Sequence, residues 1–348
     1  MDVQKQEGGD NSKNIQVIGD VTCGISYTEA RQIALDVFNA NCQKMMSEAA
    51  QTAEKRANEI VDDFIKKLFE EYPELSVRLK EPSIQYSAFS VIKNYVKTGD
   101  TELKERMLRM LIQRMEAKER SMEQIVLDEA IEVLPKLTQD HINILSLVLS
   151  SIYIIHHITN LEDLKDFINN KLMLFYPKEK SNSIYNHLQY TGCCTFLAGV
   201  STYKPFIDIV ILKYGGLFNK GFSEETFNQT FSTDCEKITP IIARCQQNKT
   251  LIQFNAINET VLKEVINQNR LESFSTQIMR LYNQNTMNND EILDYLCSIN
   301  PRMKSFIEDW NDKLSDLRSI ALTSVGYAIA ILNYNLKTGK NVPLSWYI

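Results

Sequence analysis

The residues best suited to chemistry in this sequence are its histidines and cysteines, and their spacing assembles no known site. The four histidines contain no His-x-x-x-His pair and no acidic partner for a helical zinc motif: they are His141, His156, His157 and His187. The nearest grouping is His187 with Cys193 and Cys194. Adjacent cysteines cannot both ligate one metal comfortably, and no fourth ligand follows. A partly buried helix and turn is therefore favoured over a metal site.

The short motifs that identify common enzymes are also missing from the sequence. It contains no Gly-x-Ser-x-Gly, no P-loop and no Gly-x-Gly-x-x-Gly, so hydrolases, nucleoside triphosphatases and dinucleotide enzymes have no signature here. The glycines between residues 215 and 221 are interpreted as a helix end and loop. We predict no catalytic residue, no cofactor and no metal, and we favour a non-enzymatic function. An enzyme without a recognisable short motif is an alternative.

The densest basic segment is expected to be neutralised within its own helix. Its members are Lys104, Arg106, Arg109, Arg114, Lys118 and Arg120. Glutamates stand four residues before three of these cations, at Glu102, Glu105 and Glu116, which is the helical spacing for ion pairs. A self-paired, solvated helix face is therefore favoured over a nucleic-acid patch.

Composition favours a mainly helical cytoplasmic protein. The 348 residues carry a net charge of −6 and include only 12 glycines and 8 prolines, so few positions can interrupt a helix. The seven cysteines are dispersed and odd in number, which indicates reduced thiols. Two apolar segments, 144–155 and 319–336, are too short or too polar to cross a membrane and are expected to be buried helices. Neither membrane nor nucleic acid is expected as a partner.

Residues 1–24 are predicted to form a β segment that pairs between chains. Apolar residues alternate with polar ones along it, and Gly19-Asp20 can close a two-residue turn. A single hairpin is marginally stable in water, and its unpaired edge can be satisfied by another chain. We therefore expect a shared apolar face in an oligomer, formed by Ile15, Val17, Val21 and Cys23.

A very long helix is expected to follow the β segment. Ser26 and Glu29 have the spacing of a capping box, and no glycine or proline then occurs before Pro73. An apolar stripe runs along its second half with a mean step of about 3.7 residues, which fits a straight or weakly right-handed association. Its members are Cys42, Met46, Ala49, Ala53, Ala57, Ile60, Phe64 and Leu68. The stripe could face the chain's own later helices or other subunits. For the second case, the expected contacts are Ala49, Ala53, Ala57 and Ile60.

Shorter elements with clear boundary signals are expected after Pro73. The predicted helices and their caps are 82–97, 101–119 capped by Asp100, 125–134 capped by Ser121 with Gln124, and 142–155 capped by Thr138. Further helices are predicted over 161–175, 183–190 and 310–317, with 206–212 compatible with helix or strand. A turn or short strand is expected at 191–194, and a strand over 320–323 is expected to lead into a helix from Ser324. We thus expect a mainly α fold: the N-terminal β segment (1–24), a long helix and bundle (25–136), and a mostly helical C-terminal interaction domain with a few short strands (137–348).

The two ends of the chain together resemble a family of uncharacterised bacterial proteins. The resemblance rests on Gly9-Asp10-Asn11-Ser12-x-Asn14-Ile15-Gln16, Gly19-Asp20, Gly24-Ile25-Ser26-Tyr27 and residues 35–41, and later on Leu137-Thr138 with His141 and on residues 322–326. It implies a bacterial, cytosolic protein linked to antiphage defence, because similar Gly-Asp-Asn openings occur on multidomain defence proteins. It carries no known active site.

The combined expectation is a self-assembling scaffold or sensor whose partner is itself. The C-terminal half could bind another protein. Residues 322–326 also resemble the last strand and helix of some winged-helix domains, so a nucleic-acid-binding protein is the second alternative.

Overall fold

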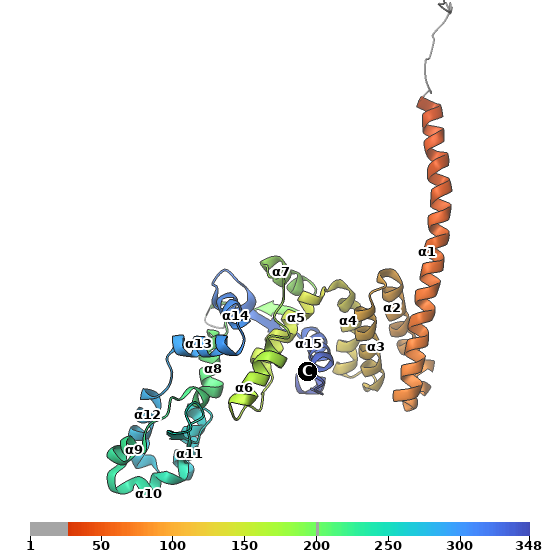
Figure 1. The fold of residues 1–348 in the computed structure, drawn as a ribbon. Helices are drawn as coiled ribbons and strands as arrows, with labels where there is room; N and C mark the ends of the chain where they lie inside the picture. Colours follow the sequence, from red (N-terminus) through yellow and green to blue (C-terminus); the bar gives the residue numbers. More distant parts are fainter. Residues whose placement is uncertain (1–26, 200–201) are drawn as a thin grey trace, which may run out of the picture. The chain divides into compact units, whose positions relative to one another are not determined.

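The structure of the chain is a computed structural model that describes residues 27–199 and 202–348, with side chains from residue 46 onward. The chain divides into two units, residues 1–59 and residues 60–348. The described residues form fifteen α-helices and four short strands (Figure 1). The mainly α fold predicted from the sparse glycines and prolines is therefore confirmed, while the predicted β segment of residues 1–24 lies outside the described residues.

The long N-terminal helix is present as predicted. Helix α1 runs without a break over Tyr27–Glu71, 45 residues that contain neither glycine nor proline. It ends two residues before Pro73, which starts a short 3₁₀ segment over Pro73–Lys80. The predicted cap residue Ser26 lies outside the described residues.

Three helices joined by short loops follow, with boundaries close to those predicted. They are α2 (Pro82–Thr98), α3 (Thr101–Glu116) and α4 (Met122–Val133). Gly99 ends α2 at a φ of 66°, a left-handed conformation that glycine adopts without strain. The Asp100 side chain accepts hydrogen bonds from the Glu102 and Leu103 amides. Helix α3 ends three residues earlier than expected, because Ala117 turns to an extended conformation.

The next two helices end in wider π-helical turns, which the sequence pattern did not reveal. Helix α5 (Gln139–Val148) continues as a π turn over Leu149–Tyr153, and α6 (Leu161–Phe167) as a π turn over Ile168–Leu172. The two π turns pack on each other, and the Ser150 hydroxyl donates to the Lys171 carbonyl at 2.6 Å. The predicted continuous helices 142–155 and 161–175 are therefore wrong in their last turns.

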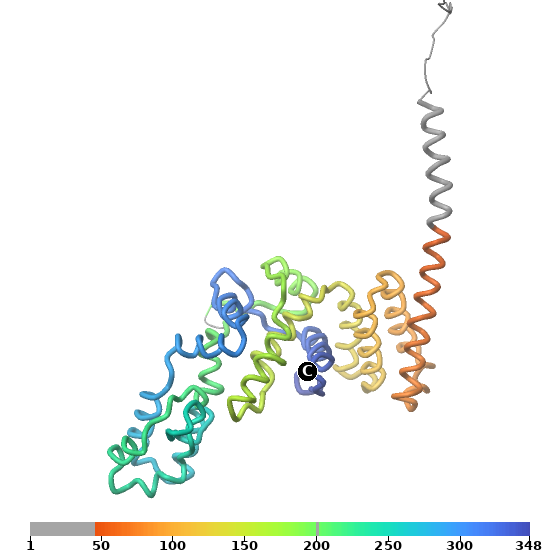
Figure 2. Tube along the Cα trace, in the orientation of Figure 1, coloured from red at the N-terminus to blue at the C-terminus, as the bar shows by residue number. Residues whose placement is uncertain are grey.

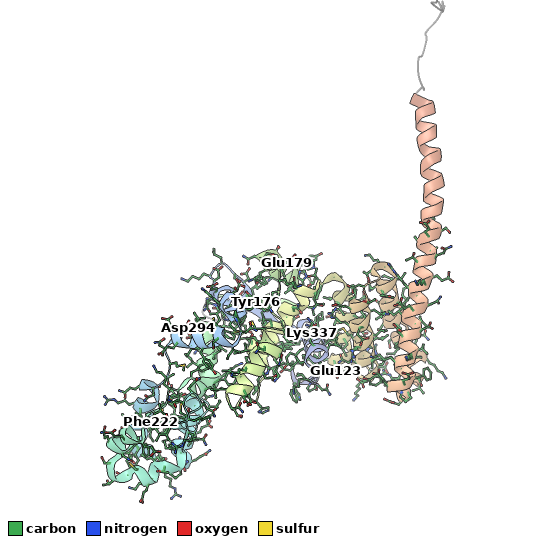
Figure 3. All side chains as sticks on the ribbon, in the orientation of Figure 1. Glu123, Tyr176, Glu179, Phe222, Asp294 and Lys337 are labelled. Atoms are coloured by element: carbon green, nitrogen blue, oxygen red, sulfur yellow. The ribbon has the colours of Figure 1, made fainter. Side chains whose placement is uncertain are left out.

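Helix α15 (Ser324–Thr338) lies at the centre of the unit formed by residues 60–348. It packs against α3, α4 and α5, and Figure 2 shows the chain returning to it after passing through all the other helices of this unit. At its C-terminal end Lys337, labelled in Figure 3, donates to the Asn143 amide oxygen at 2.9 Å. The apolar segments 144–155 and 319–336 are thus largely buried, as predicted.

A two-stranded antiparallel sheet holds the start of α15. Strand β1 (Cys194–Phe196) pairs with β4 (Ile320–Leu322), with Cys194 opposite Leu322. The Thr323 hydroxyl then accepts from the Gly326 amide, as the predicted strand-to-helix boundary requires. A Cβ at Gly326 would lie 1.9 Å from the Cys193 carbonyl oxygen, so this backbone approach needs glycine.

A second, smaller core lies among the helices of residues 222–282. It surrounds a hairpin of β2 (Ile242–Arg244) and β3 (Ile252–Phe254), and Phe222, labelled in Figure 3, belongs to it. The helices around the hairpin are α9 (Glu224–Phe231), α10 (Cys235–Ile238), α11 (Glu259–Gln268) and α12 (Ser275–Gln284).

The remaining helices belong to the main core, and one of them corrects a prediction. They are α7 (Asn182–Tyr190), α8 (Phe206–Tyr214), α13 (Asn289–Ile299) and α14 (Arg302–Asn311). Residues 206–212 are thus helical, whereas the predicted helix over 310–317 is wrong. The Asp312 carboxylate accepts from the Leu314 amide at 2.9 Å, and this local bond competes with continuation of α14.

Candidate functional site

The residues predicted to mediate self-association fall into three groups. The four β-segment residues lie outside the described part of the chain: Ile15, Val17, Val21 and Cys23. On α1, Ala49 is exposed, and Ala53 and Ala57 are half-buried. Ile60 has no exposed surface and packs in the core of its own chain, so it offers no contact to a second chain in this conformation. The assembly role of the other residues stays a prediction.

The last turns of α1 carry two apolar stripes that are offset by one residue. The buried stripe belongs to the core of residues 60–348 and consists of Ile60, Phe64 and Leu68. The second stripe, Val61, Ile65 and Phe69, is 38%, 38% and 56% exposed. Steps of four residues place these three side chains along one side of the helix. The four-residue spacing of this second stripe is present in the sequence, but only the equally regular stripe beside it was predicted.

Ion pairs fix this part of α1 against α3. Lys104 Nζ lies 2.6 Å from an Asp63 carboxylate oxygen, and Lys67 Nζ lies 3.6 Å from Glu105. The exposed stripe is therefore presented by a helix that is held on its own chain by both apolar packing and charge.

The basic segment of α3 is less solvated than predicted. The expected pairs between Arg106 and Glu102 (3.0 Å) and between Arg109 and Glu105 (2.6 Å) are present. Arg106 and Arg114, however, are only 8% and 1% exposed. The predicted spacing to Arg120 is lost because α3 ends before it. The sequence could not reveal the burial of Arg114, because its partner lies on another helix.

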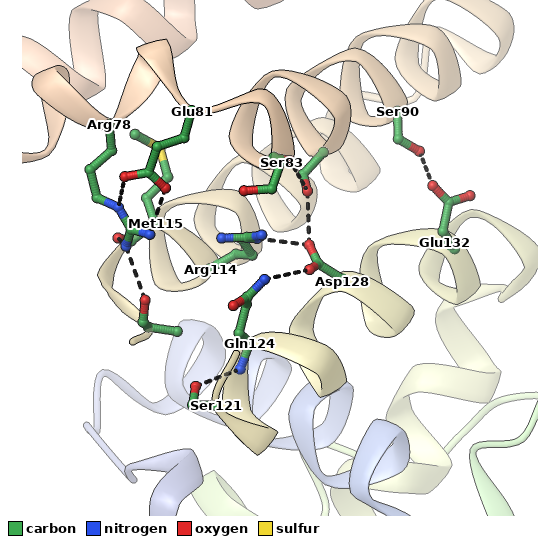
Figure 4. Close-up of polar contacts among 12 residues, drawn as sticks. Arg78, Glu81, Ser83, Ser90, Arg114, Met115, Ser121, Gln124, Asp128 and Glu132 are labelled. Atoms are coloured by element: carbon green, nitrogen blue, oxygen red, sulfur yellow. Dashed lines mark hydrogen bonds and ion pairs between the residues drawn. The ribbon is translucent and has the colours of Figure 1, made fainter. Parts of the chain in front are cut away.

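Arg114 is held by a carboxylate at the centre of a polar cluster between α2, α3 and α4 (Figure 4). Its Nε donates to Asp128 Oδ1 at 2.8 Å, and the Ser87 hydroxyl donates to the same oxygen at 2.8 Å. The Gln124 side-chain amide lies 3.4 Å from the other Asp128 oxygen, and the Gln124 backbone amide is capped by Ser121. Asp128 thus has donors on both of its oxygens.

The far end of the Arg114 guanidinium has no such partners. Neither Nη1 nor Nη2 has a hydrogen-bond partner among the described residues, although both atoms are buried. Arg114 lines a cavity of about 590 Å³, whose walls also include Ser83, Tyr86 and Val325. Buried guanidinium donors without acceptors are costly, and sequence patterns indicated neither these donors nor the cavity beside them.

A second arginine beside the cluster stabilises the C-terminal end of α3. Arg78 pairs with both Glu81 oxygens at 2.8 and 2.9 Å, and its hydrogen bonds hold the pKa of that carboxyl below its usual value. It also donates to the carbonyls of Met115 and Ala117 at the C-terminal end of α3 (Figure 4). A cation at this position stabilises the helix end.

A larger cavity, of about 770 Å³, lies beside the two π turns and is lined by His156, Asp163, Lys171 and Tyr334 among others. Burial lowers the pKa of His156 to about 4. Its Nε2 lies 2.9 Å from the Ser150 carbonyl, so this nitrogen carries the proton and donates. A general base works best with a pKa near the operating pH, so His156 is suited to packing rather than to proton transfer.

The other predicted histidine and cysteine candidates also have structural environments. His141 closes the N-terminal capping box of α5, and its ring lies 4.8 Å from that of His187. His187 Nε2 donates to the Lys136 carbonyl at 3.0 Å. Burial raises the pKa of the Cys193 thiol to about 11 and that of Cys194 to about 12, the opposite of what activates a nucleophile.

In the part of the chain that the structure describes, no group of three or more histidine, cysteine or acidic side chains is arranged to hold a metal ion. No α-helix there has the length and apolar character needed to cross a membrane.

A protein-family model matches residues 24–348 of the sequence. The chain belongs to this family. The family is uncharacterised, and its match covers every helix of the structure. No curated protein and no solved structure matches the chain.

For a member of an uncharacterised family, the geometry has to indicate the function by itself. Among the described residues, two of the features that differ from an ordinary packed core are the exposed stripe on α1 and the cavity at Arg114. The first is suited to contact with another protein, and the second to binding a small molecule.

Proposed function

We propose that the chain is a non-enzymatic scaffold that assembles with copies of itself through its N-terminal region. The observation that supports this most directly is the exposed stripe Val61, Ile65 and Phe69 on a helix whose adjacent stripe is already buried in its own chain. Regularly spaced apolar side chains left exposed on a monomer are typical of an interface.

A second copy of the chain suits this surface because it carries the same stripe. Closed homo-oligomers most often use one patch on both subunits, so a self-complementary apolar stripe satisfies both chains at once. Ala49, Ala53 and Ala57 have small side chains that allow close approach of another helix. In this proposal, the β segment with Ile15 and Val17 adds strand pairing between the same chains.

The proposed biological role is in bacterial antiphage defence, with the assembly acting as scaffold or sensor. This part of the proposal rests on the resemblance of the Gly9-Asp10-Asn11 opening to defence proteins. In this proposal the C-terminal half, residues 137–348, binds a further protein. Bacteria expressing the chain should resist phage infection, and cells expressing an Ile15→Asp/Val17→Asp variant should lose that resistance. Equal plaque counts with and without the chain would remove the defence role and leave the assembly proposal standing.

The winged-helix alternative is not favoured by the position of α15. A recognition helix must expose one face to a nucleic-acid groove, whereas α15 is buried along most of its length by α3, α4 and α5. Several of the cations on α3 are also already paired with carboxylates.

Sedimentation velocity on the full chain tests the contribution of the β segment. The Ile15→Asp/Val17→Asp variant should sediment as a smaller species with an unchanged helical circular-dichroism spectrum. Asn14→Asp/Gln16→Asp is the matched control, because these residues lie on the opposite face of the predicted strand. Sedimentation as an oligomer by both variants would exclude strand pairing through Ile15 and Val17.

A further inference from the structure

The cavity beside the two π turns contains a histidine nitrogen that the protein itself does not use. His156 is 9% exposed and lines this cavity of about 770 Å³. Its Nε2 donates to the Ser150 carbonyl at 2.9 Å, and its ring centre lies 4.5 Å from that of Phe167, so the imidazole is held in position. The other ring nitrogen, Nδ1, has no hydrogen-bond partner among the described residues and is not completely covered by protein atoms. Nδ1 is therefore the polar atom that His156 presents to the cavity.

This free nitrogen is a hydrogen-bond acceptor. A neutral imidazole carries one N–H group, and that of His156 is engaged at Nε2. Burial lowers the pKa of His156 to about 4, so the ring stays neutral near pH 7 and Nδ1 keeps its lone pair. A ligand that contacts His156 must therefore bring an N–H or O–H donor.

A second acceptor in the cavity wall is also free on one side. One Asp163 oxygen, Oδ2, accepts from the Thr159 amide at 2.9 Å, from the Thr159 hydroxyl at 2.8 Å and from the Asn160 side-chain amide at 3.0 Å. The bonds from Thr159 hold the pKa of this carboxyl below its usual value, so it is ionised. Oδ1 has no partner among the described residues and is not completely covered. These two free acceptors favour a ligand with several donors.

The charged side chains that line the cavity balance one another. The lining contains two aspartates, Asp163 and Asp166, and two lysines, Lys171 and Lys340. Lys171 Nζ lies 2.5 Å from an Asp166 oxygen, so this pair is already neutralised. An anion would meet the aspartates as well as the lysines and would gain little from net charge. The charge balance therefore favours a neutral ligand.

Aromatic and apolar side chains form the rest of the walls. The aromatic residues in the lining include Tyr153, Tyr334, Trp346 and Tyr347. Trp346 and Ile155 also line the cavity and are 74% and 86% exposed, although both are large and apolar. An exposed aromatic face suits a flat heterocycle, because base-on-ring stacking contributes about 1–3 kcal/mol. The cavity volume lies within the usual range for ligand pockets.

We infer that this cavity binds a purine nucleoside with an exocyclic amino group. The base stacks on Trp346, its amino group donates to His156 Nδ1, and a ribose hydroxyl donates to Asp163 Oδ1. Such a nucleoside is neutral, flat and rich in donors, as the walls require. The site is independent of the proposed assembly, because none of its lining residues lies on α1.

Isothermal titration calorimetry on the full chain tests the inference with two matched pairs of nucleosides. Adenosine and guanosine carry the amino group, whereas purine riboside and inosine are the same molecules without it. We expect saturable binding of adenosine or guanosine. The matched nucleoside without the amino group should bind about tenfold more weakly, because the donor to His156 Nδ1 is lost.

Two variants identify the site, and a third is a control. His156→Phe keeps a ring and removes the acceptor, so the preference for the amino nucleoside should disappear. Trp346→Ala changes an exposed side chain and should weaken binding about tenfold, because the stacking partner is lost. Tyr190→Ala removes another exposed aromatic ring, outside the cavity, and should bind as the unchanged chain does.

Several results would overturn the inference. They are no heat of binding with adenosine or guanosine at millimolar concentration, equal binding of the nucleosides without the amino group, tighter binding of the aromatic cation tyramine, or a preference for the amino group that His156→Phe retains. If circular dichroism shows that His156→Phe is unfolded, Trp346→Ala decides: unchanged affinity there would reject stacking in the cavity and with it the assignment.

Discussion

Helices α1 and α15 lack proline and were both predicted from the sequence, yet they differ in what covers them. Helix α15 is buried along its length by helices of its own chain. Helix α1 buries only the stripe that ends in Leu68 and leaves the adjacent Val61, Ile65 and Phe69 exposed. The comparison teaches that periodicity identifies an apolar face but does not say whether other helices of the chain cover it.

The largest expected effect is on the buried side of α1. Leu68→Ala removes a fully buried side chain and should lower the free energy of unfolding by about 2–5 kcal/mol. Val61→Ala, on the exposed stripe, should change it by about 0.5 kcal/mol or less, apart from any effect on association between chains. Urea unfolding followed by circular dichroism measures both. Equal losses would mean that the two stripes are not in different environments, and the comparison would fail.

A pH-dependent effect is expected beside α15, where the His156 ring lies 6.4 Å from that of Tyr334. Burial lowers the pKa of His156 from 6.5 to about 4. Below pH 6.5 the unfolded chain binds a proton there and the folded chain does not, so stability falls between pH 6.5 and 4 and then levels off. The loss should reach about 3 kcal/mol.

His156→Gln should remove this part of the pH dependence, while His157→Gln, at an exposed position, should keep it. Urea midpoints at several pH values between 7 and 4 measure the difference. A His156→Gln variant that loses stability as steeply as the unchanged chain would show that His156 is not buried beside α15.

A smaller effect is expected where α15 starts. Gly326→Ala would place a methyl group against the Cys193 carbonyl, and relief of that overlap should cost about 1–3 kcal/mol. Ser324→Ala, in the same first turn, is the control and should cost less. Thermal unfolding of the two variants tests this, and an unchanged midpoint for Gly326→Ala would show that the β1–α15 approach is looser than described.

Much of the fold could be read from local signals. Helix boundaries were predicted at Pro73, Asp100 and Thr323 because caps and breakers act within a few residues of the chain. The π turns after α5 and α6 could not be predicted, since they depend on packing against each other. The end of α14 was predicted wrongly because the helical pattern of the sequence continues past it. The hydrogen bond from the Leu314 amide to the Asp312 carboxylate competes with the helix at that point.

The candidate sites were predicted less well, for a physical reason. Arg114 looked solvated because only partners three or four residues away can be recognised in a sequence, and Asp128 lies on another helix. The exposed stripe was within reach of the sequence, but the pattern could not say that Ile60 is buried and Val61 is not. Ile60 and Val61 are adjacent on α1, so the turn of the helix between two neighbouring residues separates a buried side chain from an exposed one.

The most direct test of the account is the solution mass of the full chain by size exclusion with light scattering. An Ile65→Glu/Phe69→Glu variant should have a smaller mass than the unchanged chain, with a free energy of unfolding within about 0.5 kcal/mol of it apart from the effect of dissociation. Leu314→Glu, at an exposed apolar position away from α1, should keep the full mass. A monomeric unchanged chain, or an oligomer that the stripe variant leaves intact, would contradict assembly through α1.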